Sequence, residues 1–200
     1  WFLSPIIAWA ISRVDTNRDR VVLNQSEIED LRRINRKTWR YFEEFFTERD
    51  NWLSPDNYQL SPENVVARRT SPTNIGIQLL SILSARDFGY ISFANFVERL
   101  EKVFSTILKL EKWHGHLYNW YDTRTLKVLY PMYVSSVDSG NFIGYLVVLK
   151  NALEEYKNTP LFSENQYKGI TDTIKLAKLD FTSDAPLTVG QWKEFLKNLV

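Results

Sequence analysis

Two stretches of this sequence combine aromatic rings with planar polar side chains, and they hold the residues best suited to do chemistry. They run from about residue 51 to residue 74 and from about residue 113 to residue 141. Aromatic rings can lie against the apolar C–H faces of a sugar, while Asp, Asn and Arg side chains can make paired hydrogen bonds to its hydroxyl groups. The competing interpretation is that these rings only pack the two stretches onto the rest of the protein. We expect a carbohydrate site that contains Arg68, Arg69, Ser71, Asn74, Tyr118, Asn119, Trp120, Tyr121, Asp122, Ser135, Ser136 and Asn141.

Asp138 and Asp122 are the carboxylates best placed for such a site. Asp138 comes directly before an apolar segment, where it either caps the backbone amides of a helix or points towards a ligand. It is the catalytic candidate within this chain. Asp122 either contacts a sugar or forms an Asx turn. The two adjacent arginines of the first stretch either hold sugar hydroxyls or form ion pairs with acidic residues such as Asp87 or Glu63.

Other familiar sites are not indicated by the residue spacing. His114 and His116 are only two residues apart and have no third ligand nearby, so they do not indicate a metal site. The segment that begins at Asp15 starts like a calcium loop, but Arg20 stands at the glycine position and Ser26 at the glutamate position. A glycine-rich phosphate loop and a Ser-His-Asp signature are also missing. We therefore expect no metal and no cofactor.

The composition argues against two further classes of function. The chain has 25 basic and 24 acidic residues and a formal net charge of +1. A field of one sign that would draw it onto nucleic acid is therefore absent, and we expect no nucleic-acid partner. The sequence has no cysteine, which rules out disulfides and thiolate zinc sites and fits a reducing compartment.

Hydrophobic periodicity predicts the helices that must position the two polar stretches. The expected helices span residues 26–48, 73–87, 92–112, 139–156, 164–178 and 189–199. The segments 73–87 and 139–156 are apolar around the whole circumference, which is typical of buried helices. The segments 26–48 and 92–112 are amphipathic, with one apolar stripe and one polar face. Ser26 is the expected N-cap of the first of them.

This alternation predicts an all-α fold built as a double ring. Inner helices show no face to water and outer helices show one, so amphipathic and fully apolar segments must alternate along the chain. The long connections alternate with a short turn at residues 87–90, so both polar stretches should open at the same end of the ring. The nearest strand candidates, residues 126–130 and 133–137, are short.

The first residues, Trp1 to Ile11, are apolar but shorter than the roughly 20 residues that a bilayer span needs. The chain also starts without a methionine. We therefore interpret residues 1–13 as the remnant of a membrane-proximal segment and residues 14–200 as the N-terminal part of the helical domain.

Four motifs resemble, in order, a motif series of bacterial cyclic β-1,2-glucan synthases. They are Arg68-Arg-Thr-Ser-Pro-Thr-Asn-Ile-Gly76, Ala85-Arg-Asp-Phe-Gly89, Gly115-His-Leu-Tyr-Asn-Trp-Tyr-Asp-Thr123 and Tyr133-Val-Ser-Ser-Val-Asp-Ser-Gly-Asn141. In that family they lie between the membrane-embedded glucosyltransferase and a phosphorylase-like region. The resemblance covers residues 1–155 well and the remainder weakly.

The resemblance implies part of an (α/α)6 toroid related to β-1,2-glucanases, in a domain that closes linear β-1,2-glucan into a ring by transglycosylation. A retaining enzyme of this kind uses two carboxylates about 5 Å apart. The catalytic glutamates of the family lie further along the domain than this chain reaches. The implied partners are a β-1,2-glucan chain and the other domains of the parent polypeptide. The implied location is the bacterial inner membrane, with this domain on the cytoplasmic side.

Two classes of function are therefore open. The first is a fragment of a synthase that contributes to glucan binding and cyclisation and is inactive by itself. The alternative is a non-catalytic module that binds carbohydrate, or a helical scaffold between domains. In both cases an incomplete ring should expose apolar surface, so we also expect that the chain can self-associate.

Overall fold

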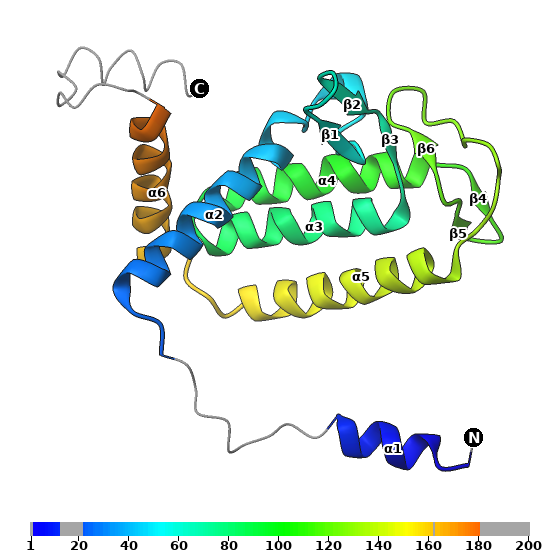
Figure 1. The fold of residues 1–200 in the computed structure, drawn as a ribbon, viewed down its shortest axis with the longest axis horizontal. Coiled ribbons are helices and arrows are strands. Elements are labelled where there is room, and N and C mark those ends of the chain that lie inside the picture. Colours follow the sequence, from blue (N-terminus) through cyan, green and yellow to red (C-terminus); the bar gives the residue numbers. More distant parts are fainter. Residues whose placement is uncertain (1, 13–21, 162, 181–200) are drawn as a thin grey trace. The chain divides into compact units, whose positions relative to one another are not determined.

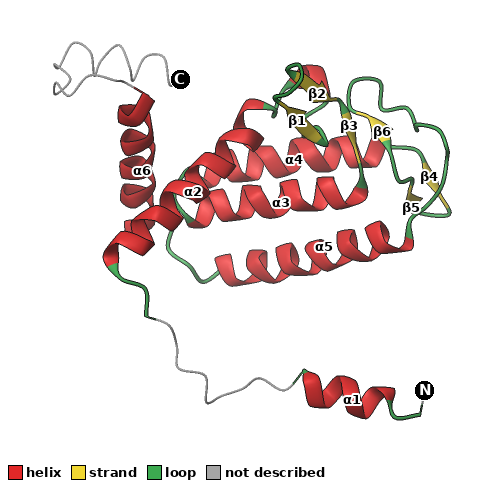
Figure 2. Cartoon of the chain, in the orientation of Figure 1, coloured by secondary structure: helices red, strands yellow, loops and turns green. Residues whose placement is uncertain are grey.

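Helices make up most of this computed structural model, which describes residues 2–12, 22–161 and 163–180 (Figures 1 and 2). The helices are α1 (Ser4–Ile11), α2 (Gln25–Glu44), α3 (Pro72–Asp87), α4 (Phe93–Lys109), α5 (Ser136–Tyr156) and α6 (Glu164–Asp180). A short 3-10 helix covers Glu48–Asp50. The helix expected over residues 189–199 lies outside the described residues.

The chain divides into two compact units, Trp1–Leu31 and Arg32–Val200, which we describe separately. The first unit contains α1 and the start of α2. At that start Asn24 accepts a hydrogen bond from the Glu27 amide, and Glu27 accepts one from the Asn24 amide, at 3.0 and 2.8 Å. The predicted N-cap at Ser26 is therefore wrong by two residues, because the reciprocal pair with Glu27 forms from Asn24. Within the described ranges, no helix has both the length and the apolar character needed to cross a membrane.

In the second unit, the apolar helix α3 is the centre of the core. It packs against both α4 and α5, and the three lie side by side in Figure 1. Leu79, Ile82 and Leu83 of α3 are at most 7% exposed. They pack in one cluster with Trp39 of α2 and Phe96 of α4. This confirms the prediction that the segment is a buried inner helix.

Helix α5 is less buried than its sequence predicts. Leu149 is buried as expected, but Phe142 and Leu146 are only partly buried. Ile143 and Val147 are 57% and 52% exposed. An apolar circumference is buried only if other elements cover every side of the helix, and within the described residues α3 covers only one side of α5.

The two long connections contain short strands that the sequence analysis did not predict. The strands are β1 (Asn57–Gln59), β2 (Val65–Ala67), β3 (Arg69–Thr70), β4 (Lys112–Trp113), β5 (His116–Leu117) and β6 (Tyr121–Asp122). They form the antiparallel pairs β1–β2, β3–β6 and β4–β5. Strands of two or three residues are too short to show an alternating pattern. Of the strand candidates proposed from the sequence, residues 126–130 contribute one bridge, from Val128 to Tyr121.

The pair β3–β6 joins the two long connections at one end of the helices, which Figure 2 shows as the end where the strands gather. The short turn between α3 and α4 passes through Gly89, whose φ of +78° is one that side chains rarely adopt. A Cβ at Gly89 or at Gly169 would overlap backbone atoms, so α6 approaches this turn backbone to backbone. Long connections at one end and a short turn at the other are the arrangement that the helix pattern predicts.

Candidate carbohydrate-binding site

Helices α3 and α5 begin side by side at the loop end. The Ser71 and Ser135 hydroxyls cap them by accepting hydrogen bonds from the amides of Asn74 and Asp138, at 3.2 and 3.1 Å. The Asn141 amide nitrogen donates to the Thr73 hydroxyl at 3.3 Å and links the two first turns. Asn74 and Asp138 are therefore the third residues of neighbouring helices, where the helix dipole favours negative charge. The predicted capping role of Asp138 belongs instead to Ser135.

Asp56, in the first connection, collects the polar side chains on one side of the site. It accepts hydrogen bonds from Arg69 at 3.0 and 3.2 Å and from the Asn74 amide nitrogen at 3.0 Å. The Arg69 guanidinium lies 4.6 Å from the centre of the Trp120 ring, which belongs to the second connection. A cation over an indole face is an attractive arrangement. Arg69 thus ties the two connections together, while about half of its side chain stays exposed.

Asn119 extends this network to α5. In the orientation that satisfies its neighbours, its amide nitrogen donates to Asp138 Oδ2 at 2.9 Å. Its amide oxygen accepts hydrogen bonds from Trp120 Nε1 and from the Tyr133 hydroxyl, each at 2.7 Å. A continuous chain of contacts therefore runs through Asp138, Asn119, Trp120, Arg69, Asp56 and Asn74. We call these six residues the loop-end network.

The neighbouring arginine, Arg68, has a different environment. It donates to Asp50 at 2.6 Å, and Asp50 also accepts from the hydroxyls of Thr123 and Thr47 at 3.1 Å each. Asp50 is 3% exposed. Burial by itself would raise the pKa of its carboxyl, but the hydrogen bonds from Arg68, Thr47 and Thr123 outweigh it and lower the pKa. Asp50 was not among the residues chosen from the sequence, because its partners Arg68 and Thr123 lie 18 and 73 positions away in the chain.

Tyr121 and Asp122 support the second connection from within. The Tyr121 ring is fully buried, and its hydroxyl donates to the Glu111 carbonyl and accepts from the Tyr118 amide, both at 2.7 Å. Burial raises the pKa of Tyr121 to about 12. Asp122 accepts hydrogen bonds from the amides of Arg124 and Thr125 at 3.0 and 2.7 Å, which is the Asx turn considered above. Of the remaining candidates, Tyr118 packs on the core and Ser136 is exposed.

A hollow of about 350 Å³ lies beside the start of α5. The hairpin β4–β5 forms one wall, with His114 and Gly115 at its tip in positive-φ conformations of 48° and 85°. Leu117, Phe142 and Ile143 give the hollow a mainly apolar lining. In the described parts of the chain, no group of three or more acidic, histidine or cysteine side chains is arranged to hold a metal ion.

Comparisons with known proteins identify the architecture. A solved endo-β-1,2-glucanase from Chitinophaga pinensis matches with a TM-score of 0.56 and 19% identity, over 78% of this chain and 36% of that one. A β-1,2-glucanase from Parabacteroides distasonis matches with a TM-score of 0.52 and 17% identity, over 78% and 21%. These similarities concern the fold alone. They confirm the predicted class, part of a helical (α/α)6 toroid.

The sequence comparisons then give the family. A family model described as "Protein of unknown function (DUF3131)" matches residues 33–164, and the chain belongs to that family. The chain is also 45% identical over 179 residues to the cyclic β-(1,2)-glucan synthase NdvB of Rhizobium meliloti (strain 1021). This confirms the resemblance that the four motifs indicate. The matched part makes up 89% of this chain but only 6% of that relative.

Proposed function

We propose that this chain forms part of the glucan-binding wall of a toroid that acts on β-1,2-glucan, within a polypeptide of the cyclic β-1,2-glucan synthase type. The observation that carries the proposal is the loop-end network, in which side chains from two connections and two helix starts are joined by contacts through the buried Asn119. The partners of this surface would be a β-1,2-glucan chain and further domains of the same polypeptide. The parent would be a membrane protein that carries this domain on the cytoplasmic side.

The chemistry of the network suits a neutral polyhydroxylated ligand. The charges of Arg69 and Asp56 compensate each other, so Asp138 is the one carboxylate of the network without a cationic partner and the surface does not favour an anion. Their planar groups still have donors and acceptors for sugar hydroxyls. Trp120 offers a partly exposed aromatic ring beside them. These groups hold one another in place before a ligand arrives, so little side-chain entropy is lost when a sugar binds.

Asp138 is our candidate for a catalytic carboxylate in this chain. Asp50 and Asp56 are bound by arginines, and Asp122 is occupied by its turn. Asp138 instead accepts a hydrogen bond from a neutral amide, at the start of a helix. Retaining and inverting glycosidases both use a pair of carboxylates, and this chain offers no second candidate beside Asp138 among its described residues. We therefore propose that Asp138 contacts the sugar and that the isolated chain does not turn it over.

The binding test is an amide and indole NMR titration of the 200-residue chain with linear β-1,2-gluco-oligosaccharides, with maltotriose as the control sugar. We expect weak, saturable shifts at Trp120, Asn119 and Asp138, and their loss in Arg69→Ala. Arg40→Ala is the matched control, because Arg40 pairs with Glu44 on the exposed face of α2. Equal shifts with both sugars, or unchanged binding by Arg69→Ala, would show that the network is not the glucan surface.

The activity test is incubation of the isolated chain with linear β-1,2-glucan, followed by analysis of chain length and cyclic product. We expect neither shortened nor cyclised glucan, because a single carboxylate cannot complete the reaction. Turnover that disappears in Asp138→Asn would instead make Asp138 catalytic in the chain as it stands. If the sugar neither binds nor reacts, the alternative function, a helical scaffold between domains, is favoured.

A further inference from the structure

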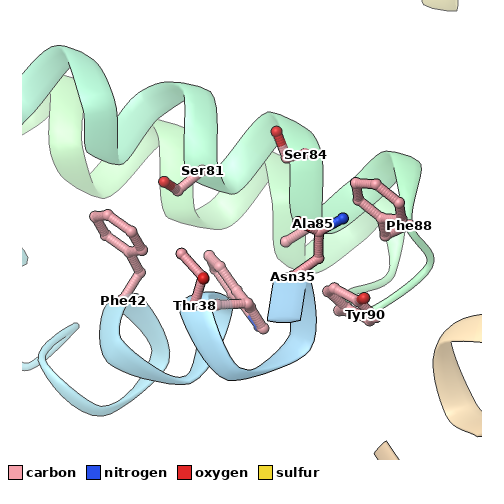
Figure 3. A pocket seen from close by; sticks show the side chains of 9 residues that line it. Asn35, Thr38, Phe42, Ser81, Ser84, Ala85, Phe88 and Tyr90 are labelled. Atoms are coloured by element: carbon pink, nitrogen blue, oxygen red, sulfur yellow. The ribbon is translucent and has the colours of Figure 1, made fainter. Parts of the chain in front are cut away.

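A second pocket lies away from the loop end, between α2 and the later half of α3 (Figure 3). Its volume is about 150 Å³. Its lining residues are Asn35, Thr38, Trp39, Phe42, Ser81, Ser84, Ala85, Phe88 and Tyr90. At about 1.5 Å of helix rise per residue, Ser84 lies roughly 15 Å along α3 from Asn74 of the loop-end network. The two sites are therefore separate.

Several polar groups of this pocket have no partner within the protein. Trp39 is 3% exposed, and its Nε1 has no acceptor among the described residues. A buried donor without an acceptor is rare, because it loses its hydrogen bond to water and gains nothing in return. Across the same described part of the chain, the side chains of Asn35, Ser81 and Ser84 also make no hydrogen bond to another protein group. The Asn35 and Ser81 side chains are half-buried and Ser84 is exposed, so these three groups are open to a ligand, whereas Trp39 Nε1 itself lies closed behind the pocket wall.

Aromatic rings form the apolar part of the lining. Phe42 comes from α2, while Phe88 and Tyr90 come from the turn after α3 and stack with ring centres 5.7 Å apart. The Tyr90 hydroxyl is anchored by hydrogen bonds to the Arg32 carbonyl at 3.2 Å and to Asp172 at 3.4 Å. In Figure 3, Phe42 and Thr38 lie on one side of the pocket, opposite Ser81, with Phe88 and Tyr90 at one end.

The charges around the pocket determine which class of ligand it suits. None of its lining residues is charged. The nearby guanidinium groups of Arg32 and Arg36 are engaged by Asp172 at 2.8 Å and by Glu43 at 3.1 Å. Each of these cations therefore already has a carboxylate partner, although Nη1 of Arg36 has no acceptor among the described residues. A purely apolar ligand would displace water from the Asn35 amide and the Ser81 and Ser84 hydroxyls without replacing its hydrogen bonds.

We propose that this pocket binds one neutral sugar ring, a glucosyl residue of a glucan chain, as a holding site separate from the loop end. Aromatic faces and the accessible hydroxyl and amide groups of Ser81, Ser84 and Asn35 together match the apolar face and the hydroxyl rim of a pyranose. The pocket is small, at about 150 Å³, so we expect it to take one sugar ring and not an oligosaccharide. The choice of glucose as the sugar rests on the proposed function.

The test is an NMR titration of the 200-residue chain with glucose and with the β-1,2-linked disaccharide, followed at the Trp39 indole N–H and the Asn35 side-chain amide. We expect both signals to shift saturably. Ser81→Leu fills the pocket with a residue that favours helix and should abolish the shifts. Asn35→Ala should weaken binding roughly two- to tenfold, the effect of one lost hydrogen bond. Ser105→Leu, at an exposed position of α4, is the matched control and should bind normally.

The outcomes separate this pocket from the loop-end site. Arg69→Ala should leave the Trp39 shift intact, because it changes only the loop end. If the loop-end signals respond to glucan and the Trp39 indole does not, the pocket proposal is wrong and the proposed function stands. If the Trp39 indole responds and the loop-end signals do not, the pocket proposal stands and the proposed function of the loop end is wrong. A Trp39 shift with inorganic phosphate in place of glucose would also overturn the proposal, since the pocket would then select an anion.

Discussion

The adjacent residues Arg68 and Arg69 have different roles in this protein. Arg68 points to the buried Asp50, which also accepts a hydrogen bond from Thr123 of the second connection, whereas Arg69 pairs with the more accessible Asp56 and lies over Trp120. Successive side chains of an extended segment point to opposite sides, which separates the two residues although they are neighbours in the chain. One arginine is therefore structural, and the other is available to a ligand.

The pH dependence of stability should reveal Asp50. Its lowered pKa means that the folded state favours the carboxylate. The stabilisation is complete above the ordinary aspartate pKa of about 3.9 and is lost as the pH falls through the lower folded-state value. We expect Asp50→Asn to lower the free energy of unfolding by roughly 1.5–3 kcal/mol at neutral pH and to flatten its decline in acid. Urea denaturation at a series of pH values from neutral to acidic measures the free energy of unfolding and its decline in acid.

The control for this prediction is Glu44→Gln, which removes an exposed carboxylate that pairs with Arg40. Exposed ion pairs contribute little, so its unfolding curves should stay close to those of the unmodified chain. If the free energy of unfolding of Asp50→Asn falls in acid as steeply as that of the unmodified chain, Asp50 is not the carboxylate that stabilises the fold.

At the scale of elements, the close pairing of α3 with α5 depends on a glycine. A Cβ at Gly76 would overlap the ring of Tyr145 on α5. The two helices can approach at this point because α3 lacks a side chain there. Glycine lowers intrinsic helix stability relative to alanine by about 1 kcal/mol, so only packing explains its use in the middle of α3.

We expect Gly76→Ala to destabilise the chain by roughly 1–3 kcal/mol, since the overlap with Tyr145 outweighs the gain in helix propensity. Gly144→Ala on α5 is the matched control, because nothing lies within 4 Å of a Cβ at that position. It should stabilise the chain by up to about 1 kcal/mol. The measurement is thermal unfolding of both variants. Equal changes in their unfolding temperatures would mean that Gly76 has no packing role.

Burial of α3 makes a second prediction at this scale. Leu79 is fully buried, so Leu79→Ala should cost roughly 2–5 kcal/mol by leaving a cavity. Ile77 on the same helix is 41% exposed, and Ile77→Ala should cost much less. If denaturant midpoints shift equally for the two variants, α3 is not the inner helix.

At the scale of the whole molecule, the exposed apolar side of α5 is the main feature. Val137, Ile143 and Val147 are more than half exposed, and the last two are four residues apart on one face. The chain matches only 36% of the length of the Chitinophaga pinensis toroid. In a larger toroid, such a face would be covered by a further inner helix.

We therefore expect the isolated chain to self-associate through α5. Sedimentation velocity should show a mass that rises with concentration, and the double variant Ile143→Lys, Val147→Lys should remain monomeric. Leu108→Lys, at a residue of α4 that is 78% exposed, is the control and should associate like the unmodified chain. A monomer at all concentrations would show that exposure of α5 has no consequence in solution.

Local sequence patterns were enough to predict the types of the helices, the alternation of amphipathic and apolar segments, and the polar-aromatic character of the two connections. These properties depend on residues three or four apart, which share one turn of a helix, so a local pattern reveals them. Four short motifs were also enough to indicate the family. The exact helix starts were predicted less accurately. Asn24 and Ser135 are the capping residues in place of Ser26 and Asp138.

Which polar side chains meet depends on how the chain folds in three dimensions. Asp50 with Arg68, Asp138 with Asn119 and Arg69 with Trp120 are contacts between separate segments. Composition cannot pair such residues, because many acidic and aromatic side chains of the two connections are equivalent by type. The burial of α5 is likewise a property of its neighbours: its apolar circumference predicts that it can be buried, and the surrounding elements decide how much of it is.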